Sequence, residues 1–198
     1  MLSLLLLSSI SAIPITFNSI IKLKSTQKEK SYLFSLPAHW SEGRQVVTGS
    51  PARADLNTYW LLLPSNSTEH SAHAPVPCNS KFRLQHVATK SFLHLSSVAS
   101  DISGHPQVIA TTEDASVLTV SCASAVWQRL DPVLLSDGAS VLGLSGVEYS
   151  QRNCPNCVIN GDSEVTHSKR IVTKWVVEDA ILMHAEDASE TGVRRDEL

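Results

Sequence analysis

The chain has 198 residues, of which 42% are hydrophobic and 18% are charged, and its formal net charge is −3. This composition is typical of a globular protein and excludes a long disordered tail. The small negative charge and the lack of a large Lys/Arg cluster give no reason to expect nucleic acid as a ligand.

The N-terminal residues 1–12 are mostly apolar and end in small residues at Ser9, Ser11 and Ala12. This stretch has the length of a signal peptide and is too short to span a bilayer, which needs about 20 apolar residues. We therefore expect residues 1–12 to be a signal peptide; the alternative is an N-terminal strand or helix of a cytosolic protein. No later stretch approaches the length of a membrane span, so stable membrane insertion is not expected.

Short runs with a period of two residues follow, separated by clusters of Gly, Pro, Ser and Asn, and they predict β-strands. The runs form three units of four strands each. The predicted strands are 21–24, 32–35, 43–48 and 59–62; then 82–85, 92–95, 105–110 and 117–120; then 132–135, 141–144, 156–159 and 174–177.

A large hydrophobic residue closes each unit, at Trp60, Leu118 and Trp175, with spacings of 58 and 57 residues. One such unit cannot bury its apolar face alone, whereas three units closing around one axis can, and closure removes exposed strand edges. We therefore predict an all-β fold, a β-trefoil over residues 18–180 with repeats at about 18–64, 79–123 and 126–180. Trp60 and Trp175 are then core residues. A β-sandwich is the alternative.

The connection between the first two units, from residue 64 to residue 77, is rich in Ser, His and Pro and reads as an exposed loop. It contains the acceptor sequence Asn66-Ser67-Thr68, which predicts N-glycosylation of Asn66 in a secreted protein. His70 and His73 flank this site, and a lone flexible pair is more often solvated than bound to a metal.

Four cysteines, Cys78, Cys122, Cys154 and Cys157, allow three disulfide connectivities. The Cys154-Pro155-Asn156-Cys157 motif is interpreted first as a local structural disulfide. A thiol–disulfide exchange site is an alternative, because this motif can hold a thiolate of low pKa. A zinc site with His167 is weaker, since the second cysteine pair of a zinc signature is missing.

The sequence stops at Arg195-Asp196-Glu197-Leu198, a close variant of the retrieval signal of lumenal proteins, within a tail of residues 181–198. Combined with a signal peptide, this ending predicts a resident of the endoplasmic reticulum lumen that binds the retrieval-signal receptor. That compartment is oxidising, which favours disulfides.

Several stretches resemble the MIR-domain family, and within it the group of stromal cell-derived factor 2-like proteins of the endoplasmic reticulum lumen. The stretches are 43–49, 57–60, 83–87 and 118–122, together with Cys78 and the run Ile181-Leu182-Met183. Leu118 departs from the pattern, because that unit usually carries Trp. The resemblance implies a Cys78–Cys122 disulfide, which would stabilise the fold by about 4 kcal/mol on the chain-entropy model.

The resemblance also implies a function: a non-catalytic adaptor or co-chaperone that works with a J-domain co-chaperone and a BiP-type chaperone on unfolded client proteins. A mannose-related carbohydrate-binding module is the first alternative, and a thiol–disulfide oxidoreductase using Cys154 and Cys157 is the second. No sequence motif of a nucleophilic enzyme, nucleotide site or metalloprotease occurs, so neither catalytic residues nor a cofactor or metal are expected.

Overall fold

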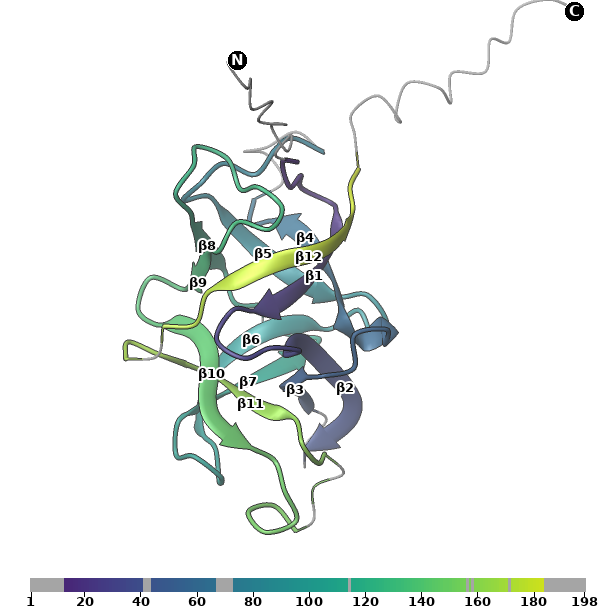
Figure 1. Cartoon of the computed structure of the whole chain (residues 1–198), viewed down its shortest axis with the longest axis vertical. Helices are drawn as coiled ribbons and strands as arrows, with labels where there is room; N and C mark the ends of the chain where they lie inside the picture. The colour runs from purple at the N-terminus through teal and green to yellow at the C-terminus, as the bar shows by residue number, and fades with distance from the viewer. Residues whose placement is uncertain are drawn as a thin grey trace, which may run out of the picture.

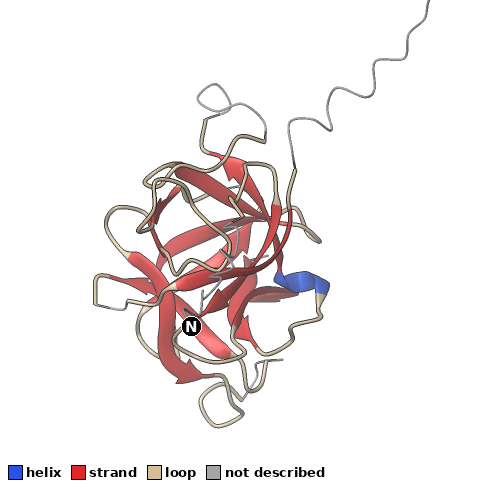
Figure 2. Cartoon of the chain, turned by 45° about the horizontal axis from the view of Figure 1, so that its top comes forward, coloured by secondary structure: helices blue, strands red, loops and turns tan. Residues whose placement is uncertain are grey.

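The computed structural model describes residues 13–40, 44–66, 73–113, 115–155, 157, 159–170 and 172–183. Its strands form one 12-stranded antiparallel sheet, and within the described chain the helical element is a short 3-10 turn, η1 (Figures 1 and 2). The elements are β1 (Ile20–Ser25), β2 (Tyr32–Trp40), β3 (Arg44–Ser50), η1 (Leu56–Thr58), β4 (Tyr59–Pro64), β5 (Lys81–His86), β6 (Phe92–Ala99), β7 (Pro106–Thr111), β8 (Leu118–Ser121), β9 (Leu134–Ser136), β10 (Val141–Glu148), β11 (Ser163–Ser168) and β12 (Trp175–Ile181).

Six strands form a closed barrel in the upper half of Figure 1. Around it, β1 pairs with β4, β4 with β5, β5 with β8 and β8 with β9, while β12 returns to β1. The last gap is closed by Val133 and Trp175, which exchange backbone hydrogen bonds of 2.9 and 2.8 Å. Closure leaves the barrel without an exposed strand edge.

Three hairpins, β2–β3, β6–β7 and β10–β11, form the lower half of Figure 1. Their second strands also pair with one another, so that β3 contacts β7, β7 contacts β11 and β11 contacts β3. Each hairpin carries one register shift in its first strand. The three hairpins are therefore built alike and close around a common centre.

A ring of backbone hydrogen bonds joins three extended segments that precede the barrel strands. The Ile15 N–H donates to the Trp127 carbonyl at 2.9 Å, Val76 donates to Ile15 at 2.8 Å, and Trp127 donates to Val76 at 2.9 Å. All three side chains are fully buried. The described chain begins and ends beside this ring, because the Thr16 hydroxyl donates to the carbonyl of Met183 at 2.9 Å.

The main core lies inside the barrel and under the hairpins, and Trp60, Leu118 and Trp175 are all fully buried in it. A smaller cluster of Val46, Tyr149 and Ile159 lies outside this core. The expected core role of the two tryptophans is confirmed.

The structure differs from the sequence prediction in the third unit. The strand expected at 156–159 is not found at the positions that the structure describes: Cys157 and Ile159 lie outside any strand, and the strand that follows β10 is β11, Ser163–Ser168. The chain turns back at Gly161, whose positive φ of 84° is favourable for glycine. At the C-terminal end of the domain, β12 continues to Ile181, the first residue of the expected tail.

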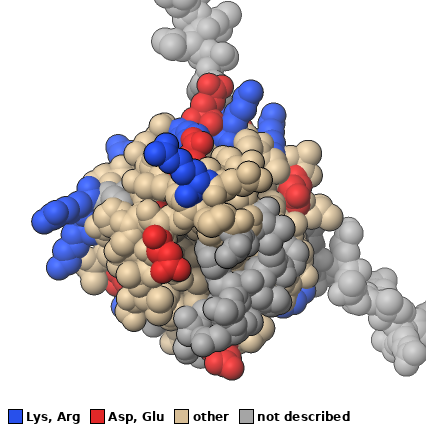
Figure 3. Space-filling view, turned by 90° about the horizontal axis from the view of Figure 1, so that it is seen from below, with Lys and Arg blue, Asp and Glu red and all other residues tan. Residues whose placement is uncertain are grey.

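The described residues contain no helix of sufficient length and apolarity to cross a membrane. On the face seen from below, acidic and basic side chains are interspersed and do not form one field of a single sign (Figure 3). This mixed surface agrees with the net charge of −3.

Candidate docking groove

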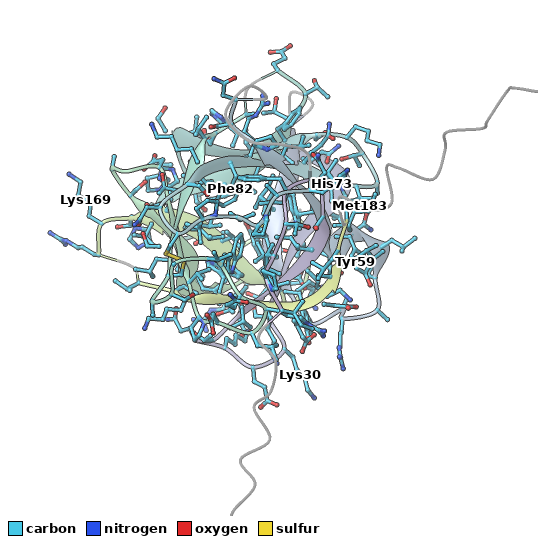
Figure 4. All side chains as sticks on the ribbon, turned by 90° about the horizontal axis from the view of Figure 1, so that it is seen from above. Lys30, Tyr59, His73, Phe82, Lys169 and Met183 are labelled. Atoms are coloured by element: carbon cyan, nitrogen blue, oxygen red, sulfur yellow. A yellow bond between two sulfur atoms is a disulfide. The ribbon has the colours of Figure 1, made fainter. Side chains whose placement is uncertain are left out.

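An apolar groove of about 300 Å³ opens on one flank of the barrel. It is lined by Ile20, Leu56, Tyr59, Val87, Ala88 and Ile181. These residues come from β1, η1, β4, the turn after β5 and the end of β12. Figure 4 shows Tyr59 and Met183 on the same flank, where the described chain ends.

The rim of the groove exposes large aliphatic side chains. Leu56 is 73% exposed and Ile181 is 59% exposed, which are among the highest values for hydrophobic residues in the described chain. Ile20 is directly opposite Ile181 in the β1–β12 ladder, so their side chains lie on the same face of the sheet. Exposed apolar side chains around one hollow are typical of an interaction site.

The Tyr59 ring is held in place by a buried lysine. The Lys22 Nζ lies 4.4 Å from the centre of the ring, a cation–π contact, and donates to the carbonyl oxygen of Arg53 at 2.8 Å. Lys22 also lies opposite Tyr59 in the β1–β4 ladder. The aromatic wall of the groove is therefore fixed before any ligand arrives.

His86 joins two walls of the groove from behind. Its Nε2 lies 3.2 Å from the carbonyl oxygen of Asn57 in η1, and its Nδ1 lies 2.9 Å from the Thr89 hydroxyl in the turn after β5. A carbonyl oxygen can only accept, so Nε2 carries the proton of the neutral ring. Burial lowers the pKa of His86, although the Asn57 carbonyl and the Asp55 carboxylate oppose this.

The position of Leu56 follows from the cap of η1. The Asp55 carboxylate accepts a hydrogen bond from the Asn57 N–H at 2.8 Å, and the Thr58 hydroxyl donates to the Asp55 carbonyl at 2.6 Å. These bonds fix the tight turn and place Leu56 at its exposed first position. The groove thus has rigid walls and an almost wholly apolar lining, which suits the binding of apolar side chains rather than acid–base chemistry.

Both disulfides are present. Cys78 is bonded to Cys122, and Cys154 is bonded to Cys157. The second disulfide lies in a surface turn, in which the Cys157 N–H donates to the Cys154 carbonyl at 3.0 Å. No helix of the described chain begins there, so the helix dipole that lowers thiol pKa values in thioredoxin-like enzymes is missing.

The zinc alternative has no geometric support in the described chain. No group of three His, Cys, Asp or Glu side chains is arranged there to hold a metal ion. His167 places its Nδ1 2.7 Å from the Ser140 hydroxyl and its Nε2 2.9 Å from the Ser96 carbonyl. Both nitrogens are therefore used within the fold.

Asn66 is exposed just beyond the end of β4. The rest of its acceptor sequence, Ser67 and Thr68, lies outside the described residues, as does His70. The same holds for residues 1–12 and for the retrieval signal Arg195, Asp196, Glu197 and Leu198.

No model of a known protein family matches the chain. A stromal cell-derived factor 2-like protein 1 of Mus musculus is 31% identical over 150 residues, which are 72% of this chain and 68% of that protein. The chain belongs to the stromal cell-derived factor 2 family. A stromal cell-derived factor 2-like protein of Arabidopsis thaliana is 27% identical over 189 residues, 90% of this chain and 84% of that protein.

Solved structures agree with the fold. The crystal structure of the SDF2-like protein from Arabidopsis thaliana has a TM-score of 0.77 at 24% identity and covers 87% of this chain and 98% of that one. The S. cerevisiae protein O-mannosyltransferase Pmt1–Pmt2 complex bound to the sugar donor has a TM-score of 0.72 at 21% identity, over 86% of this chain and 26% of that chain. The resemblance to the MIR-domain family is confirmed.

Proposed function

We propose that this member of the stromal cell-derived factor 2 family is a non-catalytic adaptor of the endoplasmic reticulum lumen. It assists complexes of a J-domain co-chaperone with a BiP-type chaperone by holding apolar segments of unfolded clients. The observation that carries the proposal is the apolar groove with its exposed rim of Leu56 and Ile181.

The barrel and its three hairpins support a β-trefoil of three repeats. The hairpins repeat one construction, and Ile15, Val76 and Trp127 occupy corresponding places in the backbone ring. A trefoil is a rigid platform, because each repeat is held by two others. Rigidity matters for an adaptor, since it presents its binding surface without a cost of ordering.

The proposed compartment is supported by two disulfides, which persist in oxidising environments. The signal-peptide pattern of residues 1–12 and the ending Arg195–Leu198 support it independently.

The occupant proposed for the groove is an apolar side chain of an unfolded polypeptide. Folded proteins bury most of such side chains, whereas unfolded ones expose them. Full burial of one Leu or Phe side chain gives about 1.5–3 kcal/mol. One groove of this size therefore binds weakly and reversibly, as an adaptor that passes clients to a chaperone must.

The test compares aggregation of a reduced, unfolded client in the presence of the wild-type protein and of two variants, Leu56→Asp and Ile181→Asp. Each adds a charge to the rim, and we expect both to lose protection of the client. Val172→Asp is the control, because Val172 is 62% exposed but lies outside the groove. Equal protection by all four proteins contradicts the proposed groove.

The adaptor role is tested separately, by isolating the tagged wild-type protein from microsomes and identifying the proteins that are recovered with it. If these include neither a J-domain protein nor a BiP-type chaperone, the adaptor role is contradicted.

A further inference from the structure

A serine and a histidine are hydrogen-bonded to each other in the third hairpin. Ser140 immediately precedes β10, and His167 lies near the end of β11, opposite Leu142 in the ladder. The Ser140 hydroxyl oxygen is 2.7 Å from His167 Nδ1. A hydroxyl within hydrogen-bond reach of an imidazole nitrogen is the first requirement of an activated nucleophile, and the second is that a third group orients the imidazole.

The Ser96 carbonyl orients the imidazole of His167. His167 Nε2 lies 2.9 Å from this carbonyl oxygen, which can only accept, so Nε2 carries the proton of the neutral ring. Nδ1 then presents its lone pair to Ser140, and the serine hydroxyl donates. Ser96 lies in the bulge of β6, between Leu95 and Ala99, where the ladder with β7 is interrupted. The ring is thus held in the tautomer that a general base needs.

A carboxylate completes the constellation. Asp137 Oδ1 accepts from the backbone N–H groups of Ala139 at 2.8 Å and of Ser140 at 2.7 Å, and it lies 3.2 Å from the Ser140 hydroxyl. The hydroxyl is closer to His167, so its proton is directed there. Burial opposes the ionisation of Asp137, but the hydrogen bonds from Ser140 and Ala139 and the charge of His167 lower its pKa. The charged carboxylate stabilises the positive ring that forms when His167 takes a proton.

Ser140 occupies a position that serine also holds in the other two units. Ser31 precedes β2 and Ser91 precedes β6, and the carbonyl of each closes the preceding turn by accepting a backbone N–H, as that of Ser140 does. However, Ser31 is 1% exposed and Ser91 is 2% exposed, whereas Ser140 is partly exposed. The three serines therefore share a backbone role, and of the three it is Ser140 that solvent reaches.

His167 has no counterpart in the other two units. The equivalent place in the ladder is held by Gly49 in the first hairpin and by Ala110 in the second. Neither residue has a polar side chain that could bond to a serine. The three hairpins nevertheless share one construction, so the histidine is not needed to form it. Its bond to Ser140 is an addition to the fold, which favours a chemical role over a structural one.

We propose that Ser140 is a nucleophile that accepts an acyl group from small, neutral, activated esters, with His167 as the general base. Ser140 Oγ attacks the carbonyl carbon of the ester while its proton passes to His167 Nδ1. The bond from the acyl carbon to the leaving oxygen then breaks, and His167 returns the proton to that oxygen or to water. The products are the acyl ester of Ser140 and the released alcohol. This modification is separate from the apolar groove and does not depend on the adaptor role.

The surroundings of Ser140 determine which acyl donors fit. Asp137, Gly138 and Ala139 are all exposed, and no heavy atom lies within 4 Å of the position that a Cβ on Gly138 would take. A donor therefore reaches the hydroxyl from solvent, across small residues. The charge of Asp137 repels anionic donors. A small neutral acyl group on a good leaving group meets both conditions.

The test is acetylation of the purified full chain with p-nitrophenyl acetate, followed by peptide mapping with mass spectrometry. We expect an acetyl ester on Ser140. Ser168, the partly exposed neighbour of His167 in β11, is the internal control and should stay unmodified. The exposed amine of Lys169 (Figure 4) shows that the reagent has reached this part of the surface. Ser140→Ala should lose the ester, and Ser168→Ala should keep it.

His167→Ala tests the role of the base. It copies Ala110 of the second hairpin, so the variant should keep the fold, which circular dichroism verifies. Acetylation of Ser140 should slow about 100-fold, as expected for loss of a general base, while acetylation of Lys169 should not change. Acetylation of Lys169 without Ser140 in the wild type, equal acetylation of Ser140 and Ser168, or an unchanged rate at Ser140 in the folded His167→Ala protein would each overturn the proposal.

Discussion

Trp60 donates its indole N–H to the carbonyl oxygen of Leu33 at 3.0 Å, in the fully buried centre of the molecule. Trp175 makes the same bond, also at 3.0 Å, to the carbonyl oxygen of Leu142. Both acceptors belong to the first strand of a hairpin, and both donors belong to the barrel. Each tryptophan therefore ties a hairpin to the barrel as well as filling the core.

Replacing Trp60 by Leu should lower the free energy of unfolding by about 3–5 kcal/mol. The substitution leaves a cavity and also leaves the buried Leu33 carbonyl without its donor. Trp60→Phe keeps a ring and should cost less. Urea denaturation followed by far-UV circular dichroism measures the free energy of unfolding of each protein. A loss below about 1 kcal/mol for Trp60→Leu would contradict a stabilising bond between Trp60 and Leu33.

In the second unit, a backbone N–H group takes the role of the indole donor. Leu118 takes the place of a tryptophan, and the Leu93 carbonyl accepts from the backbone N–H of Ser116 at 3.0 Å. A backbone donor thus replaces the missing indole. This exchange explains how the second unit can carry Leu118 where the other two units carry tryptophan and still close the barrel.

The two disulfides should differ in their contribution to stability. Cys78 and Cys122 are 44 residues apart, whereas Cys154 and Cys157 are three residues apart. On the chain-entropy model, removal of the Cys78–Cys122 disulfide lowers the free energy of unfolding by about 4 kcal/mol, and removal of the Cys154–Cys157 disulfide lowers it by about 2 kcal/mol. Paired Cys→Ser variants, compared by denaturant unfolding under non-reducing conditions, measure both costs. The reverse order would show that the chain-entropy term is not the dominant one here.

The strands could be predicted from the sequence where apolar residues alternate and turn residues bound them. Residues 92–95 are an example: Leu93 and Leu95 point into the core, and Ser91 and Lys90 mark the turn before them. β11 escaped prediction because Ser163–Ser168 contains a single aliphatic residue, Val165. It is held by pairing with three other strands, which a local pattern does not reveal.

The groove escaped prediction for a different reason. Its walls come from segments as far apart as Ile20 and Ile181, which only the β1–β12 ladder brings together. The exposure of Leu56 depends on the cap at Asp55, and no periodicity signals it. Trp127 was also missed as a core residue, because its segment joins the fold through single bridges rather than a strand.

Glu164 is 2% exposed, and neither of its carboxylate oxygens has a hydrogen-bond partner in the described chain. Glu164 pairs with Thr48 where β11 meets β3. The corresponding residues in the other two hairpins are Val46, which pairs with Ile109, and Gln107, which pairs with Thr166. Burial, followed by the charge of Glu164, raises the pKa of the nearby Tyr149. A buried carboxylate without a partner is costly.

Glu164→Val, which copies the residue of the first hairpin, should therefore stabilise the protein by about 1–3 kcal/mol at pH 7. Gln107→Val is the matched control at the corresponding, partly exposed position, and it should change stability by less than about 0.5 kcal/mol. Thermal unfolding of the three proteins at one pH measures both effects. Destabilisation by Glu164→Val would show that the carboxylate has a stabilising role.

Acid should weaken the fold through His86. Its folded-state pKa is lowered by burial, so the unfolded chain binds a proton at a pH where the native chain does not. Stability is then fully present above the ordinary histidine pKa of about 6.5 and is lost as the pH falls from there towards the lowered value. With one proton involved, the free energy of unfolding changes by at most about 1.4 kcal/mol per pH unit.

His86→Gln removes this titration while retaining a group that can donate to Asn57 and accept from Thr89. The difference in unfolding free energy between wild type and variant should therefore change between pH 7 and pH 5, with the wild type losing more. Because His86 connects η1 to the turn after β5, the loss should be accompanied by faster amide hydrogen exchange at Asn57 and Val87. Parallel pH profiles of the two proteins would contradict a neutral, buried His86.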